Sequence, residues 1–129
     1  MAFPAIPSPA LTIVAVDQTT GKQFQVATRA RQRSYRLDAA EGRYIVFAIP
    51  HGAGVGDEPG QLPLRGAYSA FSQCVLNSPE KAAAGECQDH KLLALEVGAN
   101  ETRKRVDLYD WYLPEQERAR LLAIKVETP

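Results

Sequence analysis

This 129-residue chain has two histidines, His51 and His90, and their side chains are the ones best suited to acid-base or metal chemistry. Asp57 lies shortly after His51, and Asp89 directly precedes His90. A histidine near a carboxylate can act as a general base or as a metal ligand. The two histidines are far apart in the sequence and not at the spacing of a metal-binding motif. The sequence therefore predicts no metal site, no cofactor and no catalytic residue.

The run Asp110-Trp111-Tyr112 has a functional and a structural interpretation. Functionally, the two aromatic rings could form a platform for a sugar or a peptide. Structurally, Trp111 could close the end of the core, while Asp89 caps a turn and His90 hydrogen-bonds to the terminal segment. Neighbouring residues of an extended chain point to opposite sides, which disfavours joint action of Asp89 and His90 on one substrate atom. We favour the structural interpretation and keep six candidate contacts for a ligand or partner: His51, Asp57, Asp89, His90, Trp111 and Tyr112.

The two cysteines, Cys74 and Cys87, enclose the segment VLNSPEKAAAGE. An even number of cysteines in a small, loop-rich β protein favours a disulfide formed in an oxidising compartment. The alternative is a pair of reduced, buried thiols in a cytoplasmic protein. Their spacing is unlike that of a zinc knuckle or of a Cys-x-x-Cys redox pair. We therefore predict a Cys74–Cys87 disulfide and a periplasmic or extracellular location.

Length and charge limit the classes of protein that this chain can belong to. The 129 residues suffice for one domain with its own core. Fifteen basic and fifteen acidic residues leave a net charge of zero, which argues against a nucleic-acid partner. Residues 1–10 are rich in proline and lack the basic and apolar regions of a signal peptide. We expect no transmembrane segment in this chain, and we expect that a signal sequence has been removed from it.

Short runs of β-branched and aromatic residues, bounded by turn residues, predict an all-β fold. We expect a turn at Gln18–Gly21, and the segment 67–76 fits either a strand or a helical turn. The expected strands are Leu11–Asp17, Lys22–Thr28, Ser34–Asp38, Arg43–Pro50, Lys91–Val97 and Arg103–Leu108.

The strand at Arg43–Pro50 is apolar on both faces, which is typical of a central strand. One face should lie in the main core, and the other should be covered by a loop or a helix. The Gly- and Pro-rich loop 51–66 is the expected cover. Its Gly-x-Gly-x-Gly run does not predict a phosphate site, because Asp57-Glu58-Pro59-Gly60 follows it where a helix would be needed.

Two short helices are expected. Ser78 could serve as an N-cap with Pro79 at the first helical position, three alanines follow, and Gly85 could end the helix. This helix lies between the two cysteines. A second helix is expected from Pro114 to about Leu122 and could pack on one end of the fold.

The succession Gly66-Ala67-Tyr68, Cys74, Cys87-Gln88-Asp89-His90 and Asp110-Trp111-Tyr112 resembles bacterial exported transthyretin-like, or carboxypeptidase-regulatory-like, modules. The resemblance implies an antiparallel Greek-key β-sandwich of about seven strands at residues 11–113. A proline-rich lead-in at 1–10 would precede it, and a helical tail at 114–129 would follow. It also implies a cell-envelope or secreted location, and it brings no catalytic residue. The longer segment between the cysteines and the helical tail depart from the pattern.

Two specialised activities of similar folds are not supported. Hydroxyisourate hydrolases end in Tyr-Arg-Gly-Ser, whereas this chain ends VETP. Gram-positive relatives with an isopeptide bond need a lysine in the first strand, which LTIVAVD lacks. We therefore expect a non-catalytic module that binds another protein or an envelope component. The alternative is a small-ligand or metal-binding domain, or a hydrolase accessory, that uses loop 51–66 with His51, Asp57 and His90.

Overall fold

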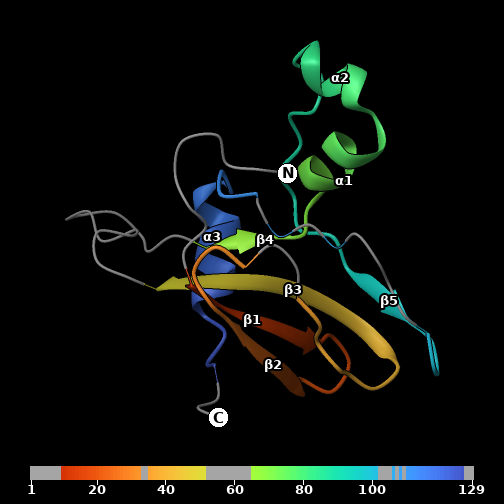
Figure 1. The fold of residues 1–129 in the computed structure, drawn as a ribbon, viewed down its shortest axis with the longest axis vertical. Coiled ribbons are helices and arrows are strands. Elements are labelled where there is room, and N and C mark those ends of the chain that lie inside the picture. The colour runs from red at the N-terminus through yellow and green to blue at the C-terminus, as the bar shows by residue number, and fades with distance from the viewer. Residues whose placement is uncertain are drawn as a thin grey trace.

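The computed structural model describes residues 10–32, 35–51, 65–101, 106, 108 and 110–126. These residues form an antiparallel sheet accompanied by short helices (Figure 1), which confirms the expected, mostly β character. The strands are β1 (Ala10–Asp17), β2 (Gln23–Thr28), β3 (Gly42–His51), β4 (Gly66–Ala67) and β5 (Leu95–Val97), and the helices are α1 (Ala70–Asn77), α2 (Pro79–Ala83) and α3 (Glu115–Leu122).

β3 is the central strand of the sheet, as predicted. The strand order is β2-β1-β3-β4, and β5 also pairs with β3. β1 runs antiparallel along β3 from the Ala10–His51 pair to the Asp17–Tyr44 pair. On the other edge of β3, Phe47 pairs with Ala67 of β4, and Gly42 pairs with Val97 of β5.

The predicted turn at Gln18–Gly21 joins β1 to β2. Asp17 Oδ1 accepts hydrogen bonds from the backbone N–H of Thr19 at 2.7 Å and of Thr20 at 3.2 Å. Gly21 has a φ of +76°, a conformation that residues with a side chain rarely adopt. This turn sets the antiparallel register of the hairpin.

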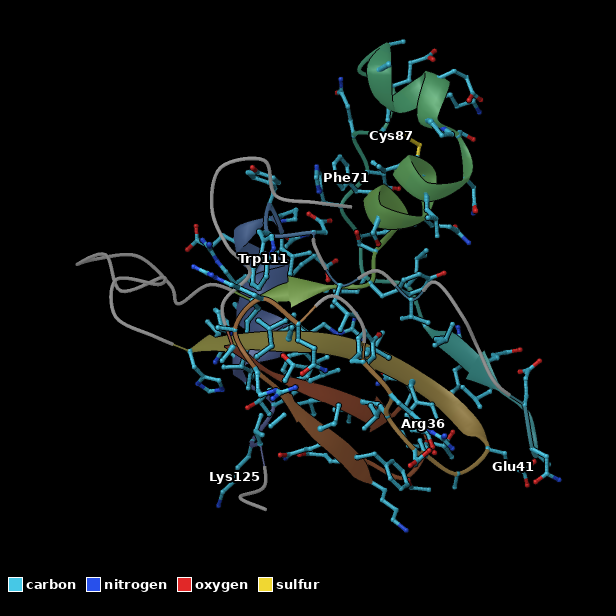
Figure 2. All side chains as sticks on the ribbon, in the orientation of Figure 1. Arg36, Glu41, Phe71, Cys87, Trp111 and Lys125 are labelled. Carbon is cyan, nitrogen blue, oxygen red and sulfur yellow. A yellow bond between two sulfur atoms is a disulfide. The ribbon has the colours of Figure 1, made fainter. Side chains whose placement is uncertain are left out.

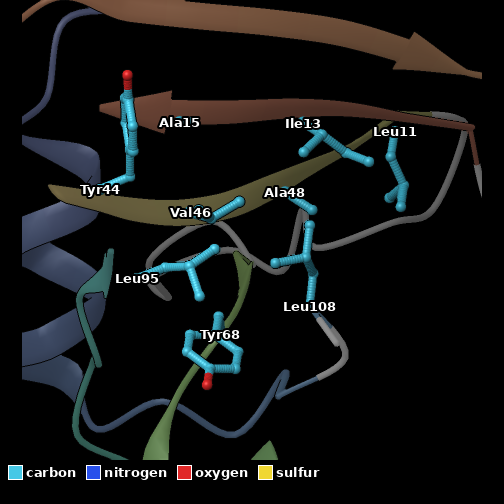
Figure 3. Close-up of a cluster of buried hydrophobic side chains, with 9 residues drawn as sticks. All are labelled: Leu11, Ile13, Ala15, Tyr44, Val46, Ala48, Tyr68, Leu95 and Leu108. Carbon is cyan, nitrogen blue, oxygen red and sulfur yellow. The ribbon is translucent and has the colours of Figure 1, made fainter. Parts of the chain in front are cut away.

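Alternate residues of β1 and β3 point to opposite sides of the sheet, and apolar residues occupy both sides. One face carries the first cluster (Figure 3), in which Tyr44 and Val46 are 1% and 4% exposed; its members are Leu11, Ile13, Ala15, Tyr44, Val46, Ala48, Tyr68, Leu95 and Leu108. The opposite face carries the second cluster, in which Phe47 is 0% exposed; its members are Val14, Val16, Ile45, Phe47, Ala67, Leu113 and Leu121.

α3 covers part of the second face, where we expected loop 51–66 to lie. Leu121 of α3 is 1% exposed within the second cluster. The C-terminal helix is therefore present where the sequence predicts it, and its Leu121 packs against side chains of β1 and β3. Residues 52–64 of the loop lie outside the described residues.

The predicted strands differ from the observed ones in two segments of the described residues. Residues 35–38 of the expected strand Ser34–Asp38 are in no strand; Tyr35 and Leu37 instead pack against the first cluster. The alternation of apolar and polar residues in this segment therefore comes from irregular chain that buries Tyr35 and Leu37 in part and exposes Arg36 and Asp38. In Lys91–Val97 only Leu95–Val97 forms a strand, and Leu92 makes an isolated antiparallel bridge to Ser69.

The described strands belong to one five-stranded sheet, so the seven-stranded Greek-key sandwich is not confirmed. Most of the expected strand Arg103–Leu108 lies outside the described residues, since only Val106 and Leu108 are described there. Leu108 is nevertheless 3% exposed in the first cluster.

The ambiguous segment 67–76 becomes the end of β4 followed by α1. Ser69 caps α1 reciprocally with Ser72: Ser69 Oγ accepts from the Ser72 N–H, and Ser72 Oγ accepts from the Ser69 N–H at 2.8 Å. α2 confirms the helix predicted between the cysteines, with Pro79 in its first turn. Gly85, at a φ of +75°, follows its end, whereas the Ser78 side chain makes no capping bond.

Candidate functional site

Residues 69–91 leave the sheet after β4 and return to it before β5, and we call them the arm. Figure 1 shows α1 and α2 of the arm standing away from the sheet. α1 buries Ser72 alone, and α2 buries no residue. The Ala70 N–H donates to the Lys91 carbonyl at 3.0 Å, so the arm departs and returns at the same place. The arm therefore contributes little to either apolar cluster.

The arm is closed by the predicted disulfide between Cys74 and Cys87, which is confirmed (Figure 2). The two Cα atoms are 5.7 Å apart. Cys87 is 8% exposed. The bond ties α1 to the segment that returns from α2.

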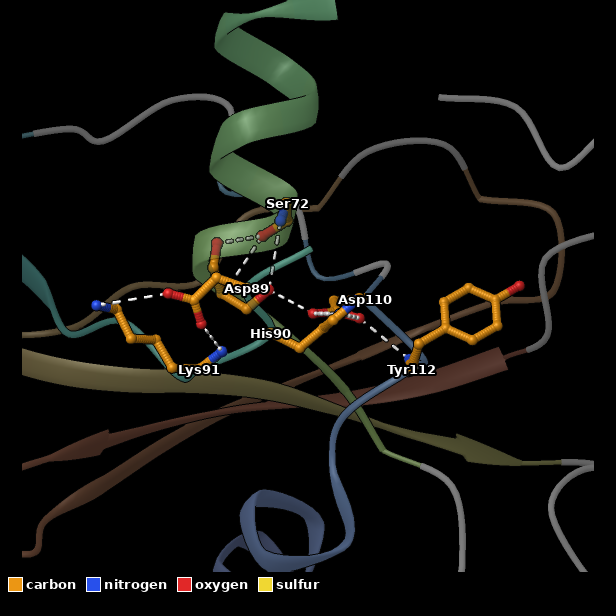
Figure 4. A network of polar contacts seen from close by, with 7 residues as sticks. Ser72, Asp89, His90, Lys91, Asp110 and Tyr112 are labelled. Carbon is orange, nitrogen blue, oxygen red and sulfur yellow. Dashed lines mark hydrogen bonds and ion pairs between the residues drawn. The ribbon is translucent and has the colours of Figure 1, made fainter. Parts of the chain in front are cut away.

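A buried carboxylate, Asp110, anchors the base of the arm (Figure 4). The residue is 0% exposed and accepts from Ser69 Oγ at 2.5 Å, from His90 Nδ1 at 2.8 Å and from the Tyr112 N–H at 3.0 Å. Three donors around one carboxylate compensate for the loss of water on burial. Asp110 thereby joins both ends of the arm to the segment that leads into α3.

The contact with Asp110 orients the imidazole of His90. Because a carboxylate oxygen only accepts, Nδ1 of His90 carries the proton in this pair. The ring stacks on Phe71 with centroids 4.4 Å apart, and the side chain is 20% exposed. No partner for Nε2 occurs among the described residues. With Nδ1 turned towards Asp110 and the ring stacked on Phe71, the Nε2 edge of the imidazole is held in a fixed direction.

Ser69, Asp110 and His90 do not form a nucleophile and its base. The Ser69 hydroxyl donates to the carboxylate, not to the imidazole, and Ser69 is 0% exposed. In a catalytic serine arrangement the hydroxyl must contact the base and reach the substrate. These three residues are therefore suited to positioning the backbone, and of the three only His90 is exposed enough to contact a ligand.

The other predicted contact residues lie apart from this network or outside the described residues. His51 Nε2 is 2.7 Å from Thr12 Oγ1 at the ends of β3 and β1. Asp89 Oδ1 accepts from the Lys91 N–H at 3.0 Å, and its Oδ2 is 3.6 Å from Lys91 Nζ. Asp57 falls outside the described residues. No three His, Cys, Asp or Glu side chains within the described ranges gather as a metal site would require.

Trp111 and Tyr112 take different environments and do not form one platform. Trp111 is partly buried against the first cluster, and its ring lies over Gly66, where an added Cβ would be 3.0 Å from two ring atoms. Tyr112 is 74% exposed, and no other large hydrophobic residue of the described ranges is exposed. Its backbone is nevertheless fixed by Asp110. The sequence indicated both aromatic residues but did not single out Asp110, because burial of a carboxylate has no local sequence signature.

No protein-family model, curated protein or solved structure matches this chain. None of the helices in the described ranges has the length and apolar character needed to cross a membrane.

Proposed function

We propose that this protein is a non-catalytic binding module and that Tyr112 and the adjoining arm form its contact surface. The proposal rests on the environment of Tyr112. This residue is 74% exposed, whereas its backbone N–H donates to the fully buried carboxylate of Asp110. Exposing a large aromatic side chain brings no gain from the hydrophobic effect. Tyrosine is, however, enriched among residues that dominate binding energy at protein interfaces.

The arm supports the same proposal. Its outer helix, α2, buries no residue, yet a disulfide and the Asp110 network hold the arm in one shape. A preorganised surface loses less conformational entropy when it binds than a mobile one. The same carboxylate binds His90 of the arm and the Tyr112 backbone, so both are anchored at one buried point.

We further propose that the module acts in the cell envelope or outside the cell. The disulfide supports an oxidising compartment. The succession of Cys87, His90 and the run Asp110-Trp111-Tyr112 supports a bacterial, transthyretin-like sandwich module. Cell fractionation with rapid thiol blocking tests the location: Cys74 and Cys87 should be recovered oxidised in the periplasmic or secreted fraction. Recovery as free thiols in the cytoplasm would contradict it.

The binding proposal is tested with two matched surface variants, Tyr112→Ala and Gln18→Ala. Gln18 is exposed in the turn between β1 and β2, at a distance along the chain from the arm. Proteins captured from envelope extract by the unmodified chain are purified and titrated individually. Tyr112→Ala should weaken the affinity at least tenfold, which corresponds to about 1.4 kcal/mol, and Gln18→Ala should leave it unchanged. Equal affinity for both variants would rule out Tyr112 as the contact.

A second candidate function, ligand or metal binding at His90, is favoured by the orientation of its imidazole. A carboxylate that accepts from one ring nitrogen of a histidine is typical of histidines that bind a metal through the other nitrogen. Calorimetric titration with Zn²⁺ and Cu²⁺ tests this candidate on the unmodified protein, on His90→Gln and on His51→Gln. Binding that disappears only in His90→Gln would support it, and absence of binding to the unmodified protein would remove it.

A further inference from the structure

The outer part of the arm, residues 78–88, has few bonds to the rest of the described structure. Its backbone hydrogen bonds stay inside the arm: the Ser78 N–H donates to the Cys74 carbonyl at 2.9 Å, and the Glu86 N–H donates to the Lys81 carbonyl at 2.8 Å. The Gln88 side chain likewise donates to the Gly85 carbonyl at 2.6 Å. Of these residues Cys87 alone is buried. Among the described residues, the one covalent cross-link of the outer arm is the disulfide to Cys74.

The base of the arm is held differently. Ser69 and His90 both bond the buried carboxylate of Asp110. The Ala70 N–H also donates to the Lys91 carbonyl across the base. None of these bonds involves the disulfide, so we expect them to remain when the disulfide is broken.

The outer arm cannot keep its shape by local bonding alone. α2 has five residues, far fewer than an isolated helix needs to be stable in water. The disulfide limits the conformations of the chain between its two cysteines, and this restriction ends when the bond is broken. Loss of the bond should therefore release residues 78–88 and leave the sheet intact.

We propose that the Cys74–Cys87 disulfide is a reversible modification site at which a dithiol reductant switches the outer arm between an ordered and a released state. Cys74 is the more exposed of the two residues, since Cys87 is 8% exposed. A thiolate of the dithiol attacks the Cys74 sulfur, the bond between the two sulfur atoms breaks, and Cys87 leaves as a thiolate. The second thiol of the reductant then displaces Cys74. The reductant is oxidised by two electrons to its disulfide, and both cysteines take up protons according to the pH.

Hydrogen exchange with mass spectrometry tests the switch in the whole chain, with dithiothreitol as the reductant. Reduction should raise the exchange rate of the backbone amides of residues 80–88 at least tenfold. Amides of β1 and β3 should change less than twofold, and oxidised glutathione should restore the original pattern. The variant Cys74→Ser/Cys87→Ser should show the released pattern without reductant. Loss of protection in β1 and β3, or unchanged protection in the arm, would overturn the proposal.

A second measurement locates the attacked sulfur. The native protein is treated with 2-mercaptoethanol, quenched in acid and mapped by peptide mass. The mixed disulfide should be found on Cys74, and an adduct on Cys87 would contradict the assigned direction of attack. Because both measurements report on the arm directly, they can fail while binding through Tyr112 stands, and the reverse also holds.

Discussion

β3 and α2 are both regular elements of this chain, but different forces hold them. In β3 the consecutive residues 44–48 are all buried, and their side chains fill apolar clusters on both sides of the sheet. In α2 no residue is buried, and a disulfide and a polar network at the base of the arm position it. Apolar burial is shared by many neighbours, whereas a cross-link acts at one point. Damage to the sheet should therefore unfold the domain, and damage to the outer arm should remain local.

The largest effect is expected from Phe47→Ala, which removes a side chain with 0% exposure from the second cluster. The cavity and the lost apolar contacts should lower the free energy of unfolding by about 3–5 kcal/mol. Urea denaturation followed by circular dichroism measures this loss. Tyr112→Ala is the control, because removal of an exposed side chain should change stability by no more than about 0.5 kcal/mol. Similar losses for the two variants would contradict the assignment of the core.

Asp110→Ala tests the base of the arm, where the arm joins the sheet. The substitution should lower the free energy of unfolding by about 2–4 kcal/mol. The substitution leaves Ser69 Oγ, the Tyr112 N–H and His90 Nδ1 without their shared acceptor. Asp89→Ala is the matched control, since the Asp89 side chain is 60% exposed. Hydrogen exchange should show faster opening at the base of the arm in Asp110→Ala alone. An unchanged unfolding midpoint would mean that the buried network does not stabilise the junction.

Trp111→Ala should lower stability by about 2 kcal/mol, less than a fully buried tryptophan would lose, because Trp111 is only partly buried. The ring covers Gly66 and the edge of the first cluster. The unfolding midpoint in urea measures the effect. If the midpoint is unchanged but partner binding is lost, Trp111 belongs to the binding surface and not to the core.

The smallest effect concerns pH and Tyr44 in the first cluster. Burial, and secondly the negative charge of Asp17, raise the pKa of Tyr44 above its ordinary value of 10.0. The folded protein therefore keeps this proton at a pH where the unfolded chain loses it. Its contribution to stability should be complete below about pH 10 and decline as the pH rises through the folded pKa. Between pH 8 and 11 the unfolding midpoint should fall less steeply with pH in Tyr44→Phe than in the unmodified protein. Parallel pH curves for the two proteins would contradict this account.

Much of the sheet could be predicted from the sequence, because the relevant signals are local. The apolar run LTIVAVD indicates β1, the alternating residues of Lys22–Thr28 indicate β2, and the apolar run within Arg43–Pro50 indicates a central strand. Asp17 and Gly21 specify the turn between the first two strands. The residues that begin and end α2 are also local signals.

The cover of the second face, the base of the arm and the exposure of Tyr112 were decided by the tertiary structure. The alternating segment 35–38 looks like a strand in the sequence, but pairing requires a neighbouring strand that no local pattern supplies. Asp110 and Ser69 are 41 positions apart and meet only after β4 and the chain before α3 are brought together. The apolar pattern of Arg43–Pro50 required a cover for both faces, but it could not identify α3 as that cover. The periodicity of apolar residues indicates which side of a strand or helix is buried. The element that packs against that side depends on contacts between residues far apart in the sequence.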